Sequence, residues 1–402
     1  MRDENAVESN LNRRTLLRRG AVATTGLVAL GAGASAQSDE TDEPTVITER
    51  TTITEPGEYV LGDDLEVDDE SCLTIRASDV TLDGRGHEIV RTGDRALPDP
   101  DRPDPDTAGI GTDAPDSEPL SDITVTNVTV SNFGAGIHFD DVRDGSIGET
   151  TVRENNVGIY LENSTAITVA ESTVDRTGWR GIALFDSDDN VVTKNTSNNG
   201  DHDLSRGLEL LNSNQNTIEK NTASNNFTGV ELGNSHGNRL EENTFRDNEH
   251  ENVVLRESNT NAILENTVTG AGWVGISVTG TGNEFKRNAV RDTRGYGFIV
   301  SGAENLVREN EITGSAADGL NLDGERGRIE ENTTSENDLA GIRVSGSEYA
   351  LNENVSTRNG EAELFLDEES SNTTGTGNLL SDDECPYFVD EGTNNDVEYT
   401  TE

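Results

Sequence analysis

Two glutamates and two arginines recur at spacings that would bring them onto one surface. Glu209 and Glu231 hold the same place in consecutive copies of a repeat of 22 or 23 residues, and Arg180 and Arg206 begin two of these copies. If each copy forms one turn of a β-solenoid, the two carboxylates lie ~4.8 Å apart. Like charges this close either raise the pKa of one carboxyl group, as in a general acid or base, or require a bridging cation such as calcium. The arginines would neutralise the carboxylate of a uronate sugar.

One repeat is four residues longer than its neighbours, and its excess includes Asp201-His202-Asp203. In an enzyme, this arrangement would suit β-elimination or epimerisation at a uronate, with His202 or Glu209 as the base. Asp203 or Glu231 would then hold the proton partner or a cation. The alternative is acidic surface decoration, because the chain has 78 acidic residues.

Four aromatic residues share one column of the repeat: Trp179, Phe227, His250 and Trp273. The two tryptophans are the only ones in the chain, and four repeats, or ~19 Å, separate them. Exposed aromatic rings along a groove would stack on about four sugar residues of a polysaccharide. The alternative is that these rings plug corners of the core.

The repeat itself predicts the fold. Apolar residues two apart mark one short strand in each copy, and the segments from residue 136 onward are Gly136–Phe139, Gly158–Leu161, Gly181–Leu184, Gly207–Leu210, Gly229–Leu232, Asn252–Leu255, Gly275–Val278, Gly297–Val300, Gly319–Leu322 and Gly341–Val344. Several short strands per repeat without a helical pattern indicate a β-solenoid. We expect an all-β, single-stranded solenoid of about 12 turns.

Two columns of asparagine share this period. One runs through Asn195, Asn221, Asn243, Asn266, Asn288, Asn310, Asn332 and Asn354, and the other through Asn190, Asn216, Asn238, Asn261, Asn283 and Asn305. Asparagine tolerates the left-handed backbone of a sharp corner, and stacked amides can bond one another along the column. We expect these residues to serve folding rather than function.

The composition limits the possible partners. The chain has 30 basic and 78 acidic residues, and its only lysines are Lys194, Lys220 and Lys286. Such uniform acidity indicates adaptation to high salt, where self-repulsion is screened. It argues against nucleic acid and anionic membranes as partners.

The N-terminus resembles an export signal. Asn12–Arg18 matches a twin-arginine motif, an apolar stretch follows, and Ala34-Ser35-Ala36 fits a signal-peptidase site, so residues 1–36 would be removed. The remaining chain has 25 basic and 75 acidic residues, a net charge of −50. It lacks a segment long enough to span a bilayer. We expect an exported protein, extracellular or at the cell surface.

The rest of the chain predicts one domain. Residues 37–45 would be a flexible acidic linker, and residues 46–402 the solenoid. Within it, residues 91–121 are rich in Pro and Asp, so we expect an insertion loop rather than ladder strands.

The opening Ile53–Leu61, the segment Ala77–His87 and the Gly-Ile-x-Leu and Asn-x-Ile-x-x-Asn-Thr units resemble right-handed parallel β-helix proteins. The similarity is to the NosD-like group, within the carbohydrate-binding and sugar-hydrolase class of pectate-lyase-like fold, and it covers about residues 46–402. NosD-like proteins imply copper. Copper prefers His, Cys and Met, whereas the exported chain has two distant cysteines, five scattered histidines and no methionine, so we do not expect copper here.

These observations predict a monomeric, salt-adapted β-helix that binds, and modifies if it is an enzyme, an extracellular polysaccharide or cell-surface glycan. The alternative function is a non-catalytic, NosD-like accessory or surface scaffold. A bare acidic sheet with Trp179 and Trp273 turned inward would favour the scaffold.

Overall fold

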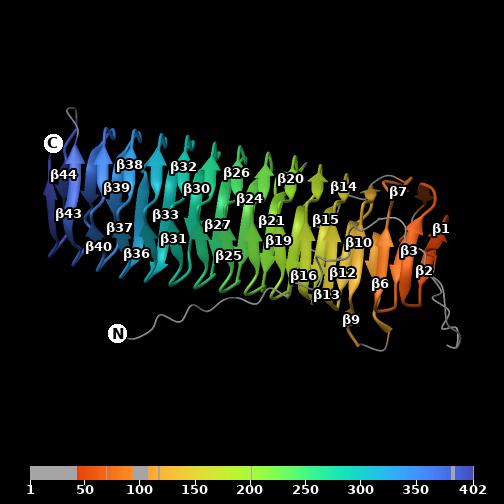
Figure 1. Cartoon of the computed structure of the whole chain (residues 1–402). Coiled ribbons are helices and arrows are strands. Elements are labelled where there is room, and N and C mark those ends of the chain that lie inside the picture. The colour runs from red at the N-terminus through yellow and green to blue at the C-terminus, as the bar shows by residue number, and fades with distance from the viewer. Residues whose placement is uncertain are drawn as a thin grey trace, which may run out of the picture. The chain divides into compact units, whose positions relative to one another are not determined.

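The computed structural model describes residues 43–68, 70–93, 107–115, 118–200, 202–381 and 385–401. They belong to one compact unit, Glu43–Glu402. The elements in these residues are all strands, which confirms the all-β prediction (Figure 1). The predicted signal peptide and residues 37–42 of the predicted linker lie outside the described residues, and a strand already begins at Thr45. The described residues contain no helix long and apolar enough to cross a membrane.

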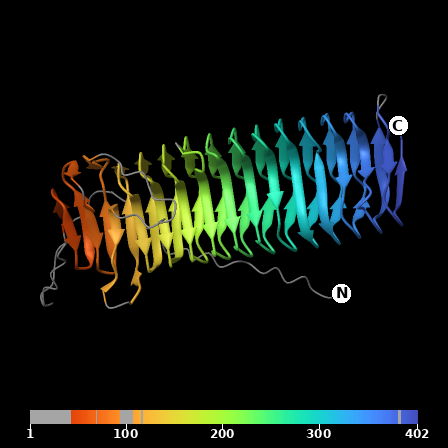
Figure 2. The same ribbon diagram turned by 180° about the vertical axis from the view of Figure 1, so that it is seen from behind.

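The strands wind into a right-handed parallel β-solenoid, and one strand per turn forms a 15-stranded parallel sheet (Figures 1 and 2). Its strands, in spatial order, are β2 (Thr51–Ile53), β5 (Leu73–Ile75), β8 (Ala108–Thr112), β12 (Ala135–Asp140), β15 (Val157–Glu162), β18 (Arg180–Phe185), β21 (Arg206–Leu211), β24 (Thr228–Gly233), β27 (Glu251–Arg256), β30 (Val274–Val278), β33 (Tyr296–Ala303), β36 (Leu320–Glu325), β39 (Ala340–Val344), β42 (Ala362–Leu366) and β44 (Phe388–Asp390). The solenoid therefore has about 15 turns. The predicted number of about 12 is too low.

The other strands form a 30-stranded sheet in two parallel rows. The first row comprises β1 (Thr45–Ile47), β3 (Gly57–Leu61), β6 (Val80–Asp83), β10 (Ile123–Thr126), β13 (Val142–Gly148), β16 (Thr165–Ala170), β19 (Val191–Thr193), β22 (Thr217–Glu219), β25 (Arg239–Glu241), β28 (Ala262–Leu264), β31 (Glu284–Lys286), β34 (Leu306–Arg308), β37 (Arg328–Glu330), β40 (Ala350–Asn352), β43 (Thr374–Ser381) and β45 (Asp396–Thr400), with β9 (Leu120–Ser121) paired to β13. The second row comprises β4 (Leu65–Val67), β7 (Glu88–Arg91), β11 (Thr129–Ser131), β14 (Thr151–Arg153), β17 (Thr173–Asp175), β20 (Thr196–Asn198), β23 (Thr222–Ser224), β26 (Thr244–Arg246), β29 (Thr267–Thr269), β32 (Ala289–Arg291), β35 (Glu311–Thr313), β38 (Thr333–Ser335) and β41 (Val355–Thr357), and it ends on the last residues of β43.

The predicted register is correct. Ile182 pairs with Leu208 and Leu208 with Val230, so residues one repeat apart are neighbours. These apolar residues point inward and are almost fully buried, in one core that runs the length of the solenoid. Each such side chain contributes roughly 1.5–3 kcal/mol by leaving water. The alternate residues of each strand point outward and form the surface on which function can reside.

The asparagine columns form the predicted ladders. The Asn243 N–H donates to Asn266 Oδ1 at 2.9 Å, and Asn243 Nδ2 donates to the same oxygen at 3.0 Å. The expected left-handed backbone, however, does not occur at these asparagines. It occurs one residue earlier, as at Glu242 (φ 54°) and Glu265 (φ 55°). The amides must point inward to bond the next turn, so the strained corner falls on the preceding residue, whose side chain is left at the surface.

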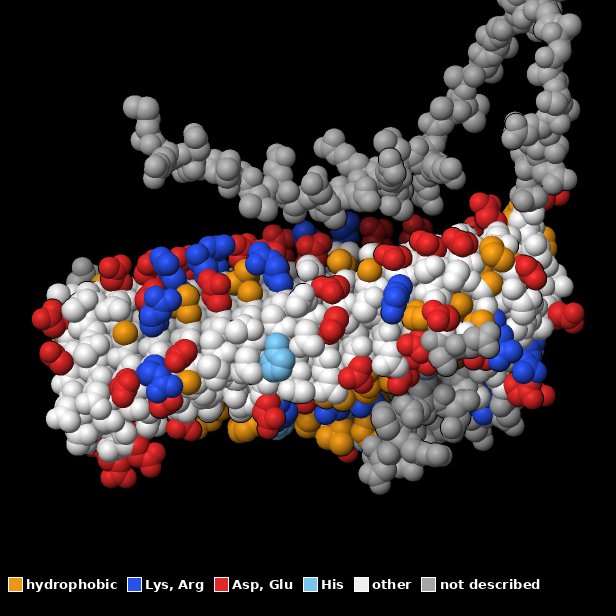
Figure 3. Space-filling view, turned by 90° about the horizontal axis from the view of Figure 1, so that it is seen from below, with side chains coloured by type: hydrophobic (Ala, Val, Ile, Leu, Met, Phe, Trp, Pro, Cys, Tyr) orange, Lys and Arg blue, Asp and Glu red, His pale blue; other side chains and the backbone are white. Residues whose placement is uncertain are grey.

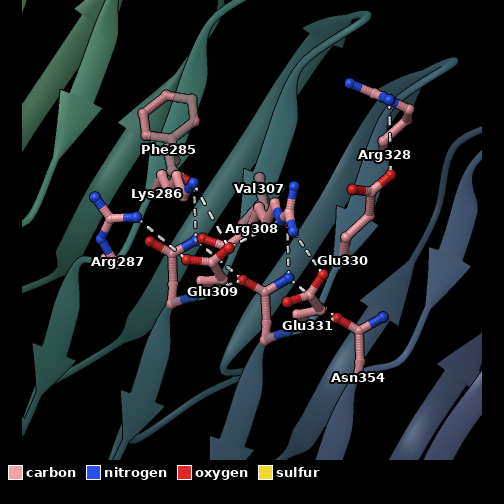
Figure 4. Close-up of polar contacts among 12 residues, drawn as sticks. Phe285, Lys286, Arg287, Val307, Arg308, Glu309, Arg328, Glu330, Glu331 and Asn354 are labelled. Atoms are coloured by element: carbon pink, nitrogen blue, oxygen red, sulfur yellow. Dashed lines mark hydrogen bonds and ion pairs between the residues drawn. The ribbon is translucent and has the colours of Figure 1, made fainter. Parts of the chain in front are cut away.

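Charged side chains therefore line this corner beside the ladder (Figure 4). Arg287 Nη1 lies 3.4 Å from Glu309 Oε2, and Arg308 Nη2 lies 2.7 Å from Glu331 Oε1. On the flank seen in Figure 3, acidic side chains are widely scattered and basic ones are fewer. Such exposed pairs contribute little each, but they reduce the repulsion among acidic residues that a repeat places in register.

The predicted insertion at residues 91–121 is partly wrong. Ala108–Thr112 forms β8, in which Ile110 pairs with Leu73 on one side and Ile137 on the other. This short run follows the last proline of the Pro98–Pro105 cluster, so its N–H groups are free to join the ladder. Residues 94–106 lie outside the described part of the chain.

Candidate functional site

The predicted aromatic column exists at the corner that precedes the 15-stranded sheet. The His250 N–H donates to Phe227 O at 2.9 Å, and the Trp273 N–H donates to His250 O at 2.8 Å, so the three residues occupy consecutive turns. The Phe227 and His250 rings are nearly parallel, with centroids 4.9 Å apart, and the His250 and Trp273 centroids are also 4.9 Å apart. We call Phe227, His250 and Trp273 the aromatic stack.

The two tryptophans differ in their exposure. Trp273 is 44% exposed, whereas Trp179 is 8% exposed. His202 covers Trp179, with ring centroids 4.0 Å apart. Ser205, which is fully buried, occupies the turn between Trp179 and Phe227 and interrupts the column. The sequence left open whether these rings face a groove or the core. Trp273 faces solvent, and Trp179 packs into the corner.

The predicted carboxylates lie on neighbouring strands, because Glu209 of β21 pairs in register with Glu231 of β24. Arginines, however, lie between them. Arg180 contacts Glu209 directly, and Arg206 Nε lies 3.2 Å from Glu209 Oε1 and 2.6 Å from Glu231 Oε2. The expected pair of unneutralised like charges does not form. Arg180 and Arg206 bind the protein's own carboxylates, not an empty space for a uronate.

Two further residues extend this row and were not predicted. Arg256 Nε donates to Glu231 Oε1 at 3.0 Å, and Arg256 Nη2 lies 3.6 Å from Glu251 Oε2. Glu251 Oε2 is also 3.2 Å from His250 Nδ1, so the ionic row meets the aromatic stack. The strand register places Glu251 one turn from Thr228, in the column that begins with Arg180 and Arg206. A third column of the repeat would have revealed it.

The ionic row, which comprises Arg180, Glu209, Arg206, Glu231, Arg256 and Glu251, is electrically balanced. Burial alone would lower the pKa of Arg206, but the carboxylates of Glu209 and Glu231 outweigh burial and raise it. Glu209 and Glu251 are almost fully buried. The row therefore presents a neutral and ordered surface on a strongly acidic protein.

His202 and Asp203 lie in the longer turn, as predicted, and His202 contacts Trp179 rather than the carboxylates. Among the described residues, no hydrogen bond or ion pair joins His202 or Asp203 to Glu209 or Glu231. His202 Nδ1 accepts the Leu204 N–H at 3.2 Å, so the neutral ring carries its proton on Nε2. The catalytic roles suggested for these residues stay predictions.

Neither copper nor calcium fits the described residues. They contain no group of three or more His, Cys, Asp or Glu side chains that could hold a metal ion. Cys72 and Cys385 are free thiols, and burial raises the pKa of Cys72 to about 11, which disfavours the thiolate that binds metals.

The fold and this surface define a parallel β-helix protein of pectate-lyase-like architecture. The chain belongs to the NosD family: the family model described as "Periplasmic copper-binding protein (NosD)" matches residues 114–271, 196–313 and 275–399. No curated protein matches the chain in sequence.

Similar solved structures support the fold. The periplasmic alginate epimerase AlgG superimposes with a TM-score of 0.57 at 14% identity, covering 73% of this chain and 77% of that one. Its D317A mutant gives 0.55 at 13% identity, covering 74% and 77%. The A-module of the Azotobacter vinelandii mannuronan C-5 epimerase AlgE4 gives 0.47 at 16% identity, covering 85% and 91%. At these identities the likeness concerns the fold alone.

Proposed function

We propose that this protein is exported and binds an extracellular polysaccharide along the aromatic stack. The observation that carries the proposal is the stack of Phe227, His250 and Trp273, which ends in a tryptophan that is 44% exposed. An exposed indole costs free energy in water, and the apolar face of a sugar ring packs well against it. The stack runs along the solenoid axis, so a polysaccharide would lie parallel to that axis.

The ionic row supports binding more than catalysis. Glu209 has contacts from Arg180 and Arg206, and Glu231 has contacts from Arg206 and Arg256. These carboxylates are therefore poorly placed to accept a proton from a substrate. They instead fix the outer face of the sheet beside the stack, as a rigid floor for a long ligand.

Two comparisons are consistent with this proposal. An alginate epimerase, a protein that acts on a polysaccharide, shares the fold. The description of the NosD family as periplasmic agrees with export. The scaffold alternative required both tryptophans to be turned inward, and Trp273 is exposed.

Titration calorimetry in multimolar salt, with a panel of acidic and neutral polysaccharides, tests the proposal. We expect Trp273→Ala to weaken binding by about 1–2 kcal/mol, or roughly fivefold to thirtyfold in Kd. The matched control is Tyr399→Ala, since Tyr399 is a similarly exposed aromatic residue (41%) in the C-terminal strand β45. Equal binding by the wild type and Trp273→Ala, or no binding to any polymer, would refute the proposal.

A further inference from the structure

The aromatic stack ends at Trp273 because the same corner of the next two turns holds small residues. These are Gly295 and Ala317, whose backbones are joined by the Ala317 N–H donating to Gly295 O at 3.0 Å. A Cβ atom on Gly295 would lie 2.2 Å from Trp273 O and 3.1 Å from Trp273 Cδ1. Glycine thus lets the chain pass close to the indole, and no side chain of Gly295 covers it.

A second large apolar side chain follows one turn later. The Leu339 N–H donates to Ala317 O at 3.3 Å, and Leu339 is 39% exposed. Trp273 and Leu339 are three turns, or ~14 Å, apart. Between them, the corner has only Gly295 and Ala317 as its floor. We call this space the corner gap.

An arginine without an ion pair adjoins the floor of the corner gap. Arg294 is exposed, and among the described residues no carboxylate lies within ion-pair distance of it. The repeat explains why. The Arg294 N–H bonds Ala271 O, and its column therefore runs from Glu249 through Gly272, Arg294 and Ala316 to Asp338. Both acidic members of the column are two turns away, ~10 Å.

We propose that the corner gap is a subsite for an acidic sugar, in which a uronate ring packs against Trp273 and its carboxylate pairs with Arg294. This inference rests on the proposed polysaccharide binding. An arginine on a chain with 78 acidic residues gains a partner wherever the repeat supplies one, and Arg180, Arg206 and Arg256 all have one in the ionic row. Arg294 is left for a carboxylate that comes from outside. The planar guanidinium suits such a group, because it can donate two parallel hydrogen bonds.

The test compares one polyuronate with its carboxyl-reduced, neutral form, by titration calorimetry in a fixed, high salt concentration. We expect the wild type to prefer the polyuronate by about fivefold, the upper range for an exposed ion pair. Arg294→Gln should abolish that preference and leave the affinity for the reduced polymer unchanged. The control is Arg143→Gln, in strand β13 of the other sheet, which is also exposed and has no ion pair among the described residues.

The outcomes separate this inference from the proposed function. If the wild type binds both polymers equally, or if Arg294→Gln keeps the preference, the acidic subsite is wrong and polysaccharide binding stands. If Arg143→Gln loses the preference as well, the effect reflects overall charge and the subsite is again wrong. If neither polymer binds, both proposals fail. Ala317→Leu, which would fill the floor of the corner gap, should weaken binding of both polymers.

Discussion

Replacement of one ladder asparagine should destabilise the solenoid far more than replacement of its exposed neighbour. Asn266 Oδ1 accepts the N–H and Nδ2 of Asn243, at 2.9 and 3.0 Å. Its Nδ2 donates to Leu240 O at 2.9 Å and to Asn288 Oδ1 at 3.0 Å. Asn266→Ala removes all four bonds, and each contributes about 1 kcal/mol net. We therefore expect the free energy of unfolding to fall by about 4 kcal/mol.

Urea denaturation at one fixed, high salt concentration, followed by far-ultraviolet circular dichroism, measures this loss. Thr267→Ala is the control, because Thr267 is the next residue, is exposed and lies in β29. We expect it to change the free energy of unfolding by about 0.5 kcal/mol or less. If Asn266→Ala costs less than about 1 kcal/mol, or no more than Thr267→Ala, the ladder does not hold the turns together as argued.

The remaining predictions concern charged groups. Arg206→Met should destabilise the protein by about 3 kcal/mol, because it leaves Glu209 and Glu231 facing each other on adjacent strands; adding Glu209→Gln and Glu231→Gln should restore much of the loss in urea denaturation, and no recovery would contradict the neutralising role. The hydrogen bond from His138 lowers the pKa of Glu162 in the folded state, so this contribution to stability is present above the unfolded pKa of about 4.3 and disappears as pH falls through the lower folded value. The stability difference between the wild type and Glu162→Gln should therefore shrink between about pH 5 and pH 3, and a difference that grows with acidity would show that the sign is wrong.

The repeat specified much of the fold in advance, since residues one period apart are neighbours in any solenoid. Register, buried faces and ladders followed from that rule. The number of turns did not, because the first three strands of the 15-stranded sheet lack the Gly-Ile-x-Leu pattern and residues 91–121 disturb the period. The left-handed corners fell one residue before the asparagines, since side-chain direction, which composition does not reveal, decides that position.

The site was predictable by column but not by exposure. Trp179 and Trp273 occupy equivalent positions, yet the neighbouring turn decides their environment. His202 covers one, and Gly295 leaves the other open. The sequence likewise brought Glu209 and Glu231 together, but an arginine between them changed the chemistry from paired acids to a neutral row.

Tryptophan fluorescence tests most directly whether the aromatic stack binds polysaccharide. In Trp179→Phe, Trp273 is the only tryptophan, and its exposure should give red-shifted emission. On titration with a polysaccharide that the wild type binds, this emission should shift to the blue or change in intensity, with the Kd found by calorimetry. The complementary variant Trp273→Phe, which retains buried Trp179, should show no such change. A bound polymer that leaves Trp273 emission unaltered would contradict the account.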